Sequence, residues 1–201
     1  MQYTDFFYPL FGYFLGSLPF ALWVTRFTKG IDIRDGGSGH VTTTNTIRQV
    51  GWLPGVIVAI LDISKGFIPT YLALNNNLPD WMIALTAAST VIGHCWPIFA
   101  GFRGGMGLAT TAGALLATSL LGFLIGLGVL IFFVLVLKHG ARGSVFAALV
   151  APLLAWVLGL RGTIIWVGVS VAIVIALRFY SEDWNREYRE LWLDRQRDDN
   201  E

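Results

Sequence analysis

Six long apolar stretches alternate with short polar segments along this chain. A helix needs roughly 20 residues to cross the hydrocarbon of a bilayer, with about 17 as the lower limit. Most of the stretches reach or approach that length, so the pattern predicts an all-α integral membrane protein. The stretches lie at about 6–25, 52–74, 81–101, 108–137, 144–160 and 162–177.

The stretch 108–137 is too long for one ordinary span and short for two. Thr118 and Ser119 interrupt it near its middle, and Gly122 and Gly126 follow closely. Hydroxyl residues and glycines disfavour an uninterrupted apolar helix at this point. We therefore predict that the stretch folds back on itself as two short helices.

The basic residues support this fold-back, because Lys and Arg collect in the cytoplasmic loops of membrane proteins. A single crossing would place Arg103 on one side and the pair Lys138 and Arg142 on the other. Two short helices place all the basic loops together, and that side then holds each of the 14 basic residues except Lys65 and Arg161. We predict seven transmembrane helices, with the N-terminus outside and the C-terminus inside.

One membrane domain is predicted to cover residues 1–180. Residues 181–201 carry charges of both signs, with Trp184, Tyr188 and Leu191 at helical spacing. This segment is predicted to be a charged cytoplasmic tail that lies as a short helix on the membrane interface.

Composition narrows the possible functions. Apolar residues make up 55% of the chain and charged residues 13%, which a soluble domain of this size could not accommodate. The net charge of +1 gives no general basic field, so nucleic acid is not expected as a partner. The single cysteine, Cys95, excludes an intrachain disulfide, and no metal site is expected.

The loop around residues 32–48 has the composition of an anion site. Glycines flank Ser38 and allow the backbone to turn sharply, so that several N–H groups can point into one concavity. The hydroxyls of residues 42–44, the Asn45 amide and the Arg48 guanidinium can add polar contacts to a phosphate group. The alternative interpretation is an ordinary glycine-rich turn followed by a threonine-rich helix cap.

A second glycine-rich loop, at residues 93–107, contains Arg103 in a turn. His94 lies at the end of an otherwise apolar segment, where an ionisable group is costly and often functional. A hydrogen-bonded structural histidine is the competing interpretation. Asp62 and Lys65 are three residues apart on one helix face, where they can neutralise each other or can place the lysine near the anion site.

These motifs together resemble the membrane acyl-phosphate:glycerol-3-phosphate acyltransferases of the PlsY type. The resemblance covers nearly the whole chain in order and spacing. The matching segments are Gly16 to Phe20, Gly37-Ser38-Gly39, Thr44-Asn45 with Arg48, Asp62 with Lys65-Gly66, Gly93-His94 to Pro97, and Gly104-Gly105 with Gly107 to Thr110.

The resemblance implies seven spans and transfer of a fatty acyl group from an acyl phosphate to the 1-hydroxyl of glycerol 3-phosphate. The products are lysophosphatidate and phosphate, a step of phospholipid biosynthesis. It implies no metal and no cofactor. It also implies a multi-pass protein of the plasma membrane whose active face is cytoplasmic.

The resemblance also assigns roles to individual residues. Ser38 and His94 are expected to be catalytic, and Asp62, Lys65 and Asn185 to support them. The residues expected to bind substrate phosphate are Gly37, Gly39, Thr44, Asn45, Arg48, Arg103, Gly104, Gly105, Gly107 and Ser144.

Several motif positions depart from the family pattern. The family has Asn where this chain has His40, a phosphate-binding Lys where Met106 stands, and His where Phe179 stands. These changes motivate an alternative function, in which a diverged homologue with weak or no catalysis binds a phosphorylated ligand or anionic lipid. A transporter is less favoured, because transporters place their sites near the membrane midplane whereas these polar residues lie in loops at one face.

Overall fold

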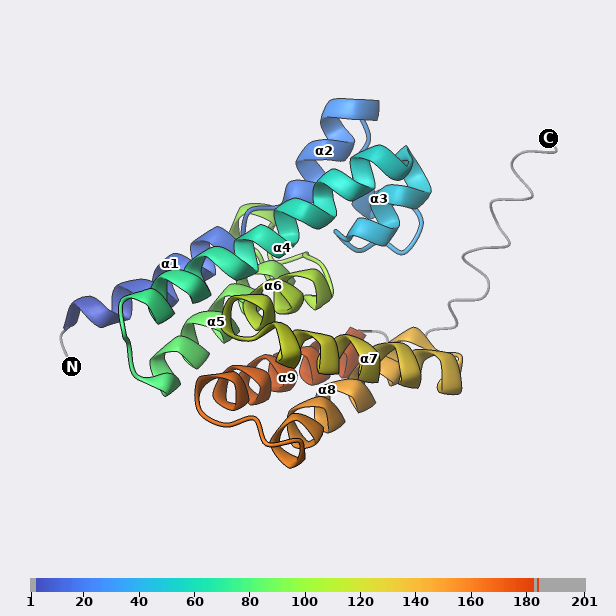
Figure 1. Cartoon of the computed structure of the whole chain (residues 1–201). Helices are drawn as coiled ribbons and strands as arrows, with labels where there is room; N and C mark the ends of the chain where they lie inside the picture. The colour runs from blue at the N-terminus through green and yellow to red at the C-terminus, as the bar shows by residue number, and fades with distance from the viewer. Residues whose placement is uncertain (1–2, 183, 185–201) are drawn as a thin grey trace.

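The computed structural model describes residues 3–182 and residue 184, and within this part of the chain it contains helices and no strand. The α-helices are α1 (Phe7–Gly16), α2 (Phe20–Lys29), α3 (Thr43–Val50), α4 (Trp52–Asn75), α5 (Asp80–Cys95), α6 (Leu108–Thr118), α7 (Leu120–Leu137), α8 (Gly140–Val157) and α9 (Thr163–Glu182). Figure 1 shows the helices running side by side. Helices α5 and α6 lie between α1 on one side and α7, α8 and α9 on the other. Short 3-10 turns cover Tyr3–Phe6, Ile33–Asp35 and Ile98–Ala100.

Six segments of the described chain are long and apolar enough to cross a membrane, which confirms the all-α membrane class. They are Phe7–Lys29, Trp52–Asn75, Asp80–Ala100, Leu120–Leu137, Gly140–Val157 and Thr163–Glu182. The remaining apolar helix, α6, has 11 residues and is shorter than a spanning helix needs.

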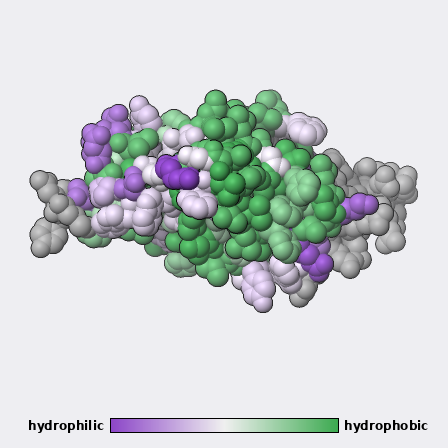
Figure 2. All heavy atoms as spheres, turned by 60° about the horizontal axis from the view of Figure 1, so that its bottom comes forward, coloured by the Kyte–Doolittle hydropathy of each residue, from purple (hydrophilic) through white to green (hydrophobic). Residues whose placement is uncertain are grey.

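The outer surface matches this class. Figure 2 shows an apolar band across the middle of one face, with most of the hydrophilic residues to either side of it. On α7 the exposed residues include Leu120, Leu124, Ile131 and Leu135. A soluble monomer rarely exposes such a continuous apolar surface, so lipid is its expected environment.

The first apolar stretch forms one candidate span, Phe7–Lys29, as expected. Its helix is broken between α1 and α2, because Pro19 has no backbone N–H and cannot continue the helix from Gly16. The second part then runs on to Lys29, beyond the expected end at residue 25. The break leaves irregular backbone at Ser17 to Pro19 inside the protein.

The stretch 108–137 is broken where the sequence predicts. Ser119 is extended, and its hydroxyl accepts a hydrogen bond of 3.1 Å from the Gly122 N–H at the start of α7. The two helices then fold back, so that Leu115 of α6 lies against Gly126 of α7. This arrangement brings the start of α6 and the end of α7 to the same end of the molecule.

Glycines allow the central helices to approach closely. A Cβ atom on Gly66 of α4 would lie 1.9 Å from the Thr110 carbonyl oxygen of α6, and one on Gly113 would lie 2.0 Å from that of Ile63. Small residues at helix contacts are the usual solution in membranes, where burial of apolar surface gives little net drive for association. The tight α4–α6 contact fixes the start of α6 beside the polar loops.

The segment 181–201, predicted to be an interfacial tail, lies mostly outside the described residues. Within them, α9 continues to Glu182. The ring of Trp184 lies 5.8 Å from the guanidinium carbon of Arg142, at the start of α8.

Candidate functional site

A cavity of about 400 Å³ lies where the two glycine-rich loops meet the ends of α6, α7, α8 and α9. We call it the polar cavity. Its polar lining comes from Ser38, His40, Thr42, Thr43, Thr44, Arg48, Asp62, His94 and Ser144. Its remaining lining comes from Ala59, Met106, Gly107, Leu108, Ala109, Leu130, Val134, Gly140 and Phe179.

The buried side chain of Asn45 holds the backbone of the first loop in place through hydrogen bonds. Asn45 is fully buried, and its Oδ1 accepts a 3.1 Å hydrogen bond from the Ser38 N–H. Its Nδ2 donates to the carbonyls of Ile33, Gly36 and His40 at 3.0–3.2 Å. Sequence reasoning expected Asn45 to bind phosphate, but the structure places its amide inside the loop and outside the polar cavity.

The glycines beside Ser38 also shape the loop and do not line the cavity. Gly37 and Gly39 have φ of 58° and 70°, a left-handed conformation that other residues adopt at a cost. A Cβ on Gly37 would also lie 2.1 Å from Asn45 Oδ1. The result is that the Ser38 side chain, with little exposed surface, lies at the cavity wall.

The start of α3 supplies the densest group of hydroxyls. Thr42 caps the helix, accepting a 3.3 Å hydrogen bond from the Asn45 N–H, and Thr43, Thr44 and Arg48 line the cavity on the same helix. Helix N-termini favour anions, because their first N–H groups have no partner within the helix. Arg48 is the only lysine or arginine among the described residues that line the cavity, so the positive charge of the lining lies beside the start of this helix.

Arg34 connects the first loop to the second, and an ion pair with Asp32 holds its side chain in place. Asp32 accepts hydrogen bonds of 2.9 Å and 2.7 Å from the Arg34 side chain, and Arg34 also donates to the Ala100 carbonyl at 3.1 Å. The hydrogen bonds from Arg34 hold the pKa of Asp32 well below its usual range. The carboxylate thus stays ionised through neutral pH, and its stabilising contribution is lost only in strong acid.

The second loop makes its contacts mainly through backbone. The Gly105 N–H donates to the His94 carbonyl at 3.1 Å, and the Gly104 carbonyl accepts from the Val41 N–H at 3.3 Å. A Cβ on Gly104 would lie 2.2 Å from the His94 carbonyl oxygen, so that position has no room for a side chain. Gly104 and Gly105 therefore lie behind the cavity wall, while Met106 and Gly107 form it.

Arg178 holds this loop from α9 and was not identified from the sequence. It is buried, its Nε donates to the Gly105 carbonyl at 3.1 Å, and its Nη1 pairs with Glu182 at 2.8 Å. Its guanidinium carbon lies 5.2 Å from the centre of the Trp96 ring. The available signal was an arginine near the end of an apolar helix, where an ionisable group is costly and often functional.

The other residues predicted for the site are Arg103, Ser144 and Asn185. Arg103 is exposed and does not line the cavity, whereas Ser144 does and donates to the Gly140 carbonyl at 2.8 Å. Asn185 lies outside the described residues. Arg103 is therefore not in the position of a phosphate ligand in this structure.

Asp62, Lys65 and His94 form a buried polar group under the cavity. The Lys65 Nζ lies 2.9 Å from Asp62 Oδ1, and His94 Nδ1 lies 3.6 Å from the same oxygen. Asp62 and His94 line the polar cavity, while Lys65 lines a much smaller cavity beside it. The structure thus brings His94 of α5 to the Asp62–Lys65 pair of α4, which is distant from it in the sequence.

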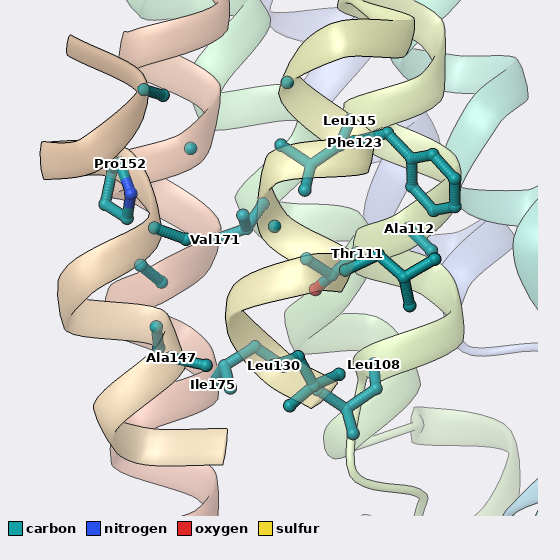
Figure 3. A pocket seen from close by; sticks show the side chains of 18 of the residues that line it. Leu108, Thr111, Ala112, Leu115, Phe123, Leu130, Ala147, Pro152, Val171 and Ile175 are labelled. Atoms are coloured by element: carbon teal, nitrogen blue, oxygen red, sulfur yellow. The ribbon is translucent and has the colours of Figure 1, made fainter. Parts of the chain in front are cut away.

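An apolar slot lies next to the polar cavity, between α6, α7, α8 and α9. Its volume is about 110 Å³, and it shares Leu108, Leu130 and Ser144 with the polar cavity. Figure 3 shows side chains of the slot facing one another across these helices, including Val171 and Ile175 of α9. Many of its lining residues are small and so leave this space open between the helices: Ala112, Gly122, Gly126, Ala147, Ala148, Ala151, Ala155, Gly168 and Ala172.

Comparison with known proteins gives consistent matches. A family model described as "Glycerol-3-phosphate acyltransferase" matches residues 6–186. The chain is 34% identical to the glycerol-3-phosphate acyltransferase of Aquifex aeolicus over 185 residues, which cover 90% of this chain and 93% of that protein. It is 44% identical to glycerol-3-phosphate acyltransferase 2 of Moorella thermoacetica over 146 residues, covering 71% and 73% of the two chains.

Solved structures agree with these sequence matches. The crystal structure of PlsY (YgiH), an integral membrane glycerol 3-phosphate acyltransferase, in its glycerol 3-phosphate form superposes with a TM-score of 0.78 at 33% identity, covering 89% of each chain. The lysophosphatidic acid form of PlsY gives a TM-score of 0.74 at 33% identity, covering 98% of this chain and 94% of that one.

Replacing Arg178 tests whether it holds the second loop. Arg178→Met removes a charged hydrogen bond to the Gly105 carbonyl, a contact worth about 1.5–3 kcal/mol. We expect the melting temperature in detergent to fall by roughly 3–12 °C for a chain of this size. Arg103→Met, at an exposed position in the same loop region, is the matched control and should leave it unchanged. Equal melting temperatures for the two variants would contradict this role.

Proposed function

Because the chain belongs to the glycerol-3-phosphate acyltransferase family, we propose that it transfers a fatty acyl group from an acyl phosphate to the 1-hydroxyl of glycerol 3-phosphate. The products are lysophosphatidate and phosphate. The observation that carries the proposal is that the polar cavity and the apolar slot are neighbours that share the lining residues Leu108, Leu130 and Ser144. An acyl phosphate has the same two parts, a charged head and an apolar chain.

The phosphate groups are proposed to bind beside the start of α3. Arg48 supplies a planar guanidinium that can bind two oxygens at once, and the hydroxyls of Thr43 and Thr44 line the same wall. Thr43 Oγ1 is buried and has no hydrogen-bond partner among the described residues, so its hydroxyl can serve a ligand. The positive end of the α3 dipole adds to this attraction.

The acyl chain is proposed to lie in the apolar slot. Lipid tails are as apolar as the slot, so the slot would select an acyl chain by shape and packing and not by hydrophobic transfer. The reacting carbonyl of the acyl phosphate, which joins its phosphate group to its acyl chain, would then lie beside the shared residues Leu108, Leu130 and Ser144. Ser38 and His94 lie in the same cavity as these residues and can reach a substrate bound there.

Acyl transfer develops negative charge on the carbonyl oxygen, which hydrogen-bond donors must stabilise. We propose that Ser38 is such a donor, because its hydroxyl lies at the cavity wall and its loop is held rigidly by Asn45. Holding both substrates in one cavity also removes much of the entropic barrier to their reaction. No step in this scheme uses a metal ion or a cofactor.

The second candidate function is ligand binding with weak or no catalysis. The observation that favours it is the apolar part of the cavity wall, where Met106 and Phe179 replace a Lys and a His of the family pattern. Losing the lysine removes a charge-assisted contact worth about 1.5–3 kcal/mol. An activity assay separates the two candidates.

We also propose that α6 and α7 form two separate crossings, which gives seven in total. The polar cavity would then face the cytoplasm of a cell membrane, with the N-terminus outside. The proposal is supported by the positions of basic residues: Lys29 ends α2 and donates to the Gln49 carbonyl of α3, Arg48 lies in α3, and Lys138 directly follows α7. Positive charge of this kind marks the cytoplasmic side.

Reconstituted protein tests the proposed activity directly. With an acyl phosphate and glycerol 3-phosphate, we expect release of phosphate in equal amount to lysophosphatidate. Ser38→Ala should lower turnover by roughly 100–1000-fold, the usual loss on removing one oxyanion donor. Ser170→Ala, whose hydroxyl bonds the Ala84 carbonyl away from the cavity, is the matched control. Absence of turnover by the wild-type protein, alongside an active family member, would leave ligand binding as the function.

The apolar slot can be tested by filling it. Ala172→Phe should exclude the far end of a long acyl chain but leave short chains unaffected. A ring forced into the path of a packed chain costs about 1–3 kcal/mol, so we expect a loss of roughly 5–150-fold in kcat/KM for long acyl phosphates. Ile173→Phe places the same ring on the exposed face of α9 and should leave kcat/KM unchanged for both short and long acyl phosphates. Equal losses for short and long chains would place the acyl chain elsewhere.

Cysteine labelling tests the topology. In a Cys95→Ser background, we expect Asn76→Cys and Arg161→Cys to react with an impermeant maleimide in intact cells. Arg103→Cys and Lys138→Cys should react only after the membrane is opened. Labelling of the latter two from opposite sides would mean that residues 108–137 cross the membrane once.

A further inference from the structure

The hydroxyl oxygen of Thr111 is buried and has no hydrogen-bond partner among the described residues, although it lies on a regular helix. Within a helix, a threonine hydroxyl can donate to the carbonyl four residues earlier. Other threonines of the described helices make this bond at 2.7–3.4 Å: Thr25, Thr28, Thr46, Thr70, Thr86, Thr90 and Thr118. The hydroxyl of Thr111 is therefore directed away from its own helix.

Thr46 gives a direct comparison, because it holds the same place on its helix. It is the fourth residue after the N-cap Thr42 of α3, as Thr111 is the fourth after the N-cap Gly107 of α6. Both backbone N–H groups donate to the N-cap carbonyl, at 2.9 Å and 2.8 Å. The Thr46 hydroxyl also donates to that carbonyl at 3.0 Å, whereas the Thr111 hydroxyl does not. The place of Thr111 in the helix thus does not explain the missing bond.

Thr110 also lacks this bond, but for a local reason. Its hydroxyl has no partner in the described part of the chain, and the residue four before it, Met106, precedes the helix. Thr110 is fully buried and lines neither the polar cavity nor the apolar slot. Thr111 differs because it lines the slot, and Figure 3 shows its side chain among the others that do so.

The slot offers little else that is polar. Ser144 is the only other residue with a polar side chain among the described residues of its lining, and its hydroxyl donates to the Gly140 carbonyl at 2.8 Å. A buried water needs several polar partners, and apolar cavities stay dry. A partner for the Thr111 hydroxyl must therefore arrive with the molecule that fills the slot.

The position of Thr111 indicates which part of that molecule it meets. It lies three residues beyond the shared residue Leu108, which is about 4.5 Å further along the axis of α6. It lines the slot and does not line the polar cavity. Its hydroxyl therefore lies beside the first few carbons of the acyl chain, beyond the phosphate group.

We propose that the Thr111 hydroxyl binds a hydroxyl group of the acyl chain, so that the slot selects an acyl phosphate that is hydroxylated near its carbonyl. A hydroxyl group can both donate and accept, so two of them pair without any further group. Selectivity follows because a buried hydroxyl left without a partner is costly. This inference rests on the proposed acyltransferase function and names the class of its acyl donor.

Paired acyl phosphates test the selectivity in reconstituted protein. We expect kcat/KM for one enantiomer of 3-hydroxyhexadecanoyl phosphate to exceed that for hexadecanoyl phosphate by about 10-fold, the effect of one buried hydrogen bond. The ω-hydroxyhexadecanoyl phosphate carries the same group far from Thr111 and should show no such gain.

The variant Thr111→Val removes the hydroxyl and keeps nearly the same side-chain shape. It should lower kcat/KM for the 3-hydroxy donor by about 10-fold and leave that for hexadecanoyl phosphate unchanged. Thr70→Val is the matched control, because the Thr70 hydroxyl donates to the Gly66 carbonyl of its own helix. This control should keep the wild-type preference.

Binding of the product gives a readout that needs no turnover. A ligand that binds the folded protein raises its melting temperature. The 3-hydroxyhexadecanoyl and hexadecanoyl forms of lysophosphatidate should both do so in detergent, the hydroxylated form at about 10-fold lower concentration. Thr111→Val should remove this difference.

The outcomes separate this inference from the proposed function. Wild-type turnover without a preference for the 3-hydroxy donor overturns the inference and leaves the acyltransferase function standing. Equal losses for both donors in Thr111→Val also overturn it, because the hydroxyl would then contact the carbonyl that both donors share. A preference in product binding without turnover supports the inference and rejects the acyltransferase function. If neither turnover nor a preference in binding is seen, both are rejected.

Discussion

Backbone amides and carbonyls that leave a helix within a membrane protein must find partners inside the protein, because lipid offers none. This chain leaves regular helix at several points around its polar cavity, and a buried polar side chain lies at each of them. Asn45 bonds three carbonyls of the first loop, Arg178 bonds the Gly105 carbonyl, and Lys65 bonds the Leu18 carbonyl. The shape of the cavity depends on these three side chains more than on any residue that lines it.

Much of the fold follows from the sequence, because hydropathy and the sidedness of basic residues are both strong signals in membranes. The interruption of 108–137 at Thr118 and Ser119 was predictable, since a single crossing would separate Arg103 from Lys138. The break at Pro19 was not predicted, because hydropathy is continuous through Gly16 to Phe20 and a proline within a spanning helix can be tolerated.

The site was predictable in its location and less so in its details. Ser38, Thr44, Arg48 and His94 do line one cavity, as the two glycine-rich loops suggested. The direction of a side chain is a tertiary property, and local sequence does not contain it. For that reason Asn45 was expected to face a ligand and lies instead beneath its loop, while the structural importance of Arg178 was missed.

The position of the apolar slot beside the polar cavity has a consequence for how the reaction is supplied with substrate. If the acyl chain occupies the slot as proposed, the donor and the acylated product both remain dissolved in the bilayer while only the phosphate-bearing groups exchange with water. The relevant concentration of the donor is then its mole fraction among lipids, not its amount per volume of solution. Adding inert lipid to the membrane would therefore slow such an enzyme, even though the amounts of enzyme and of both substrates stay the same.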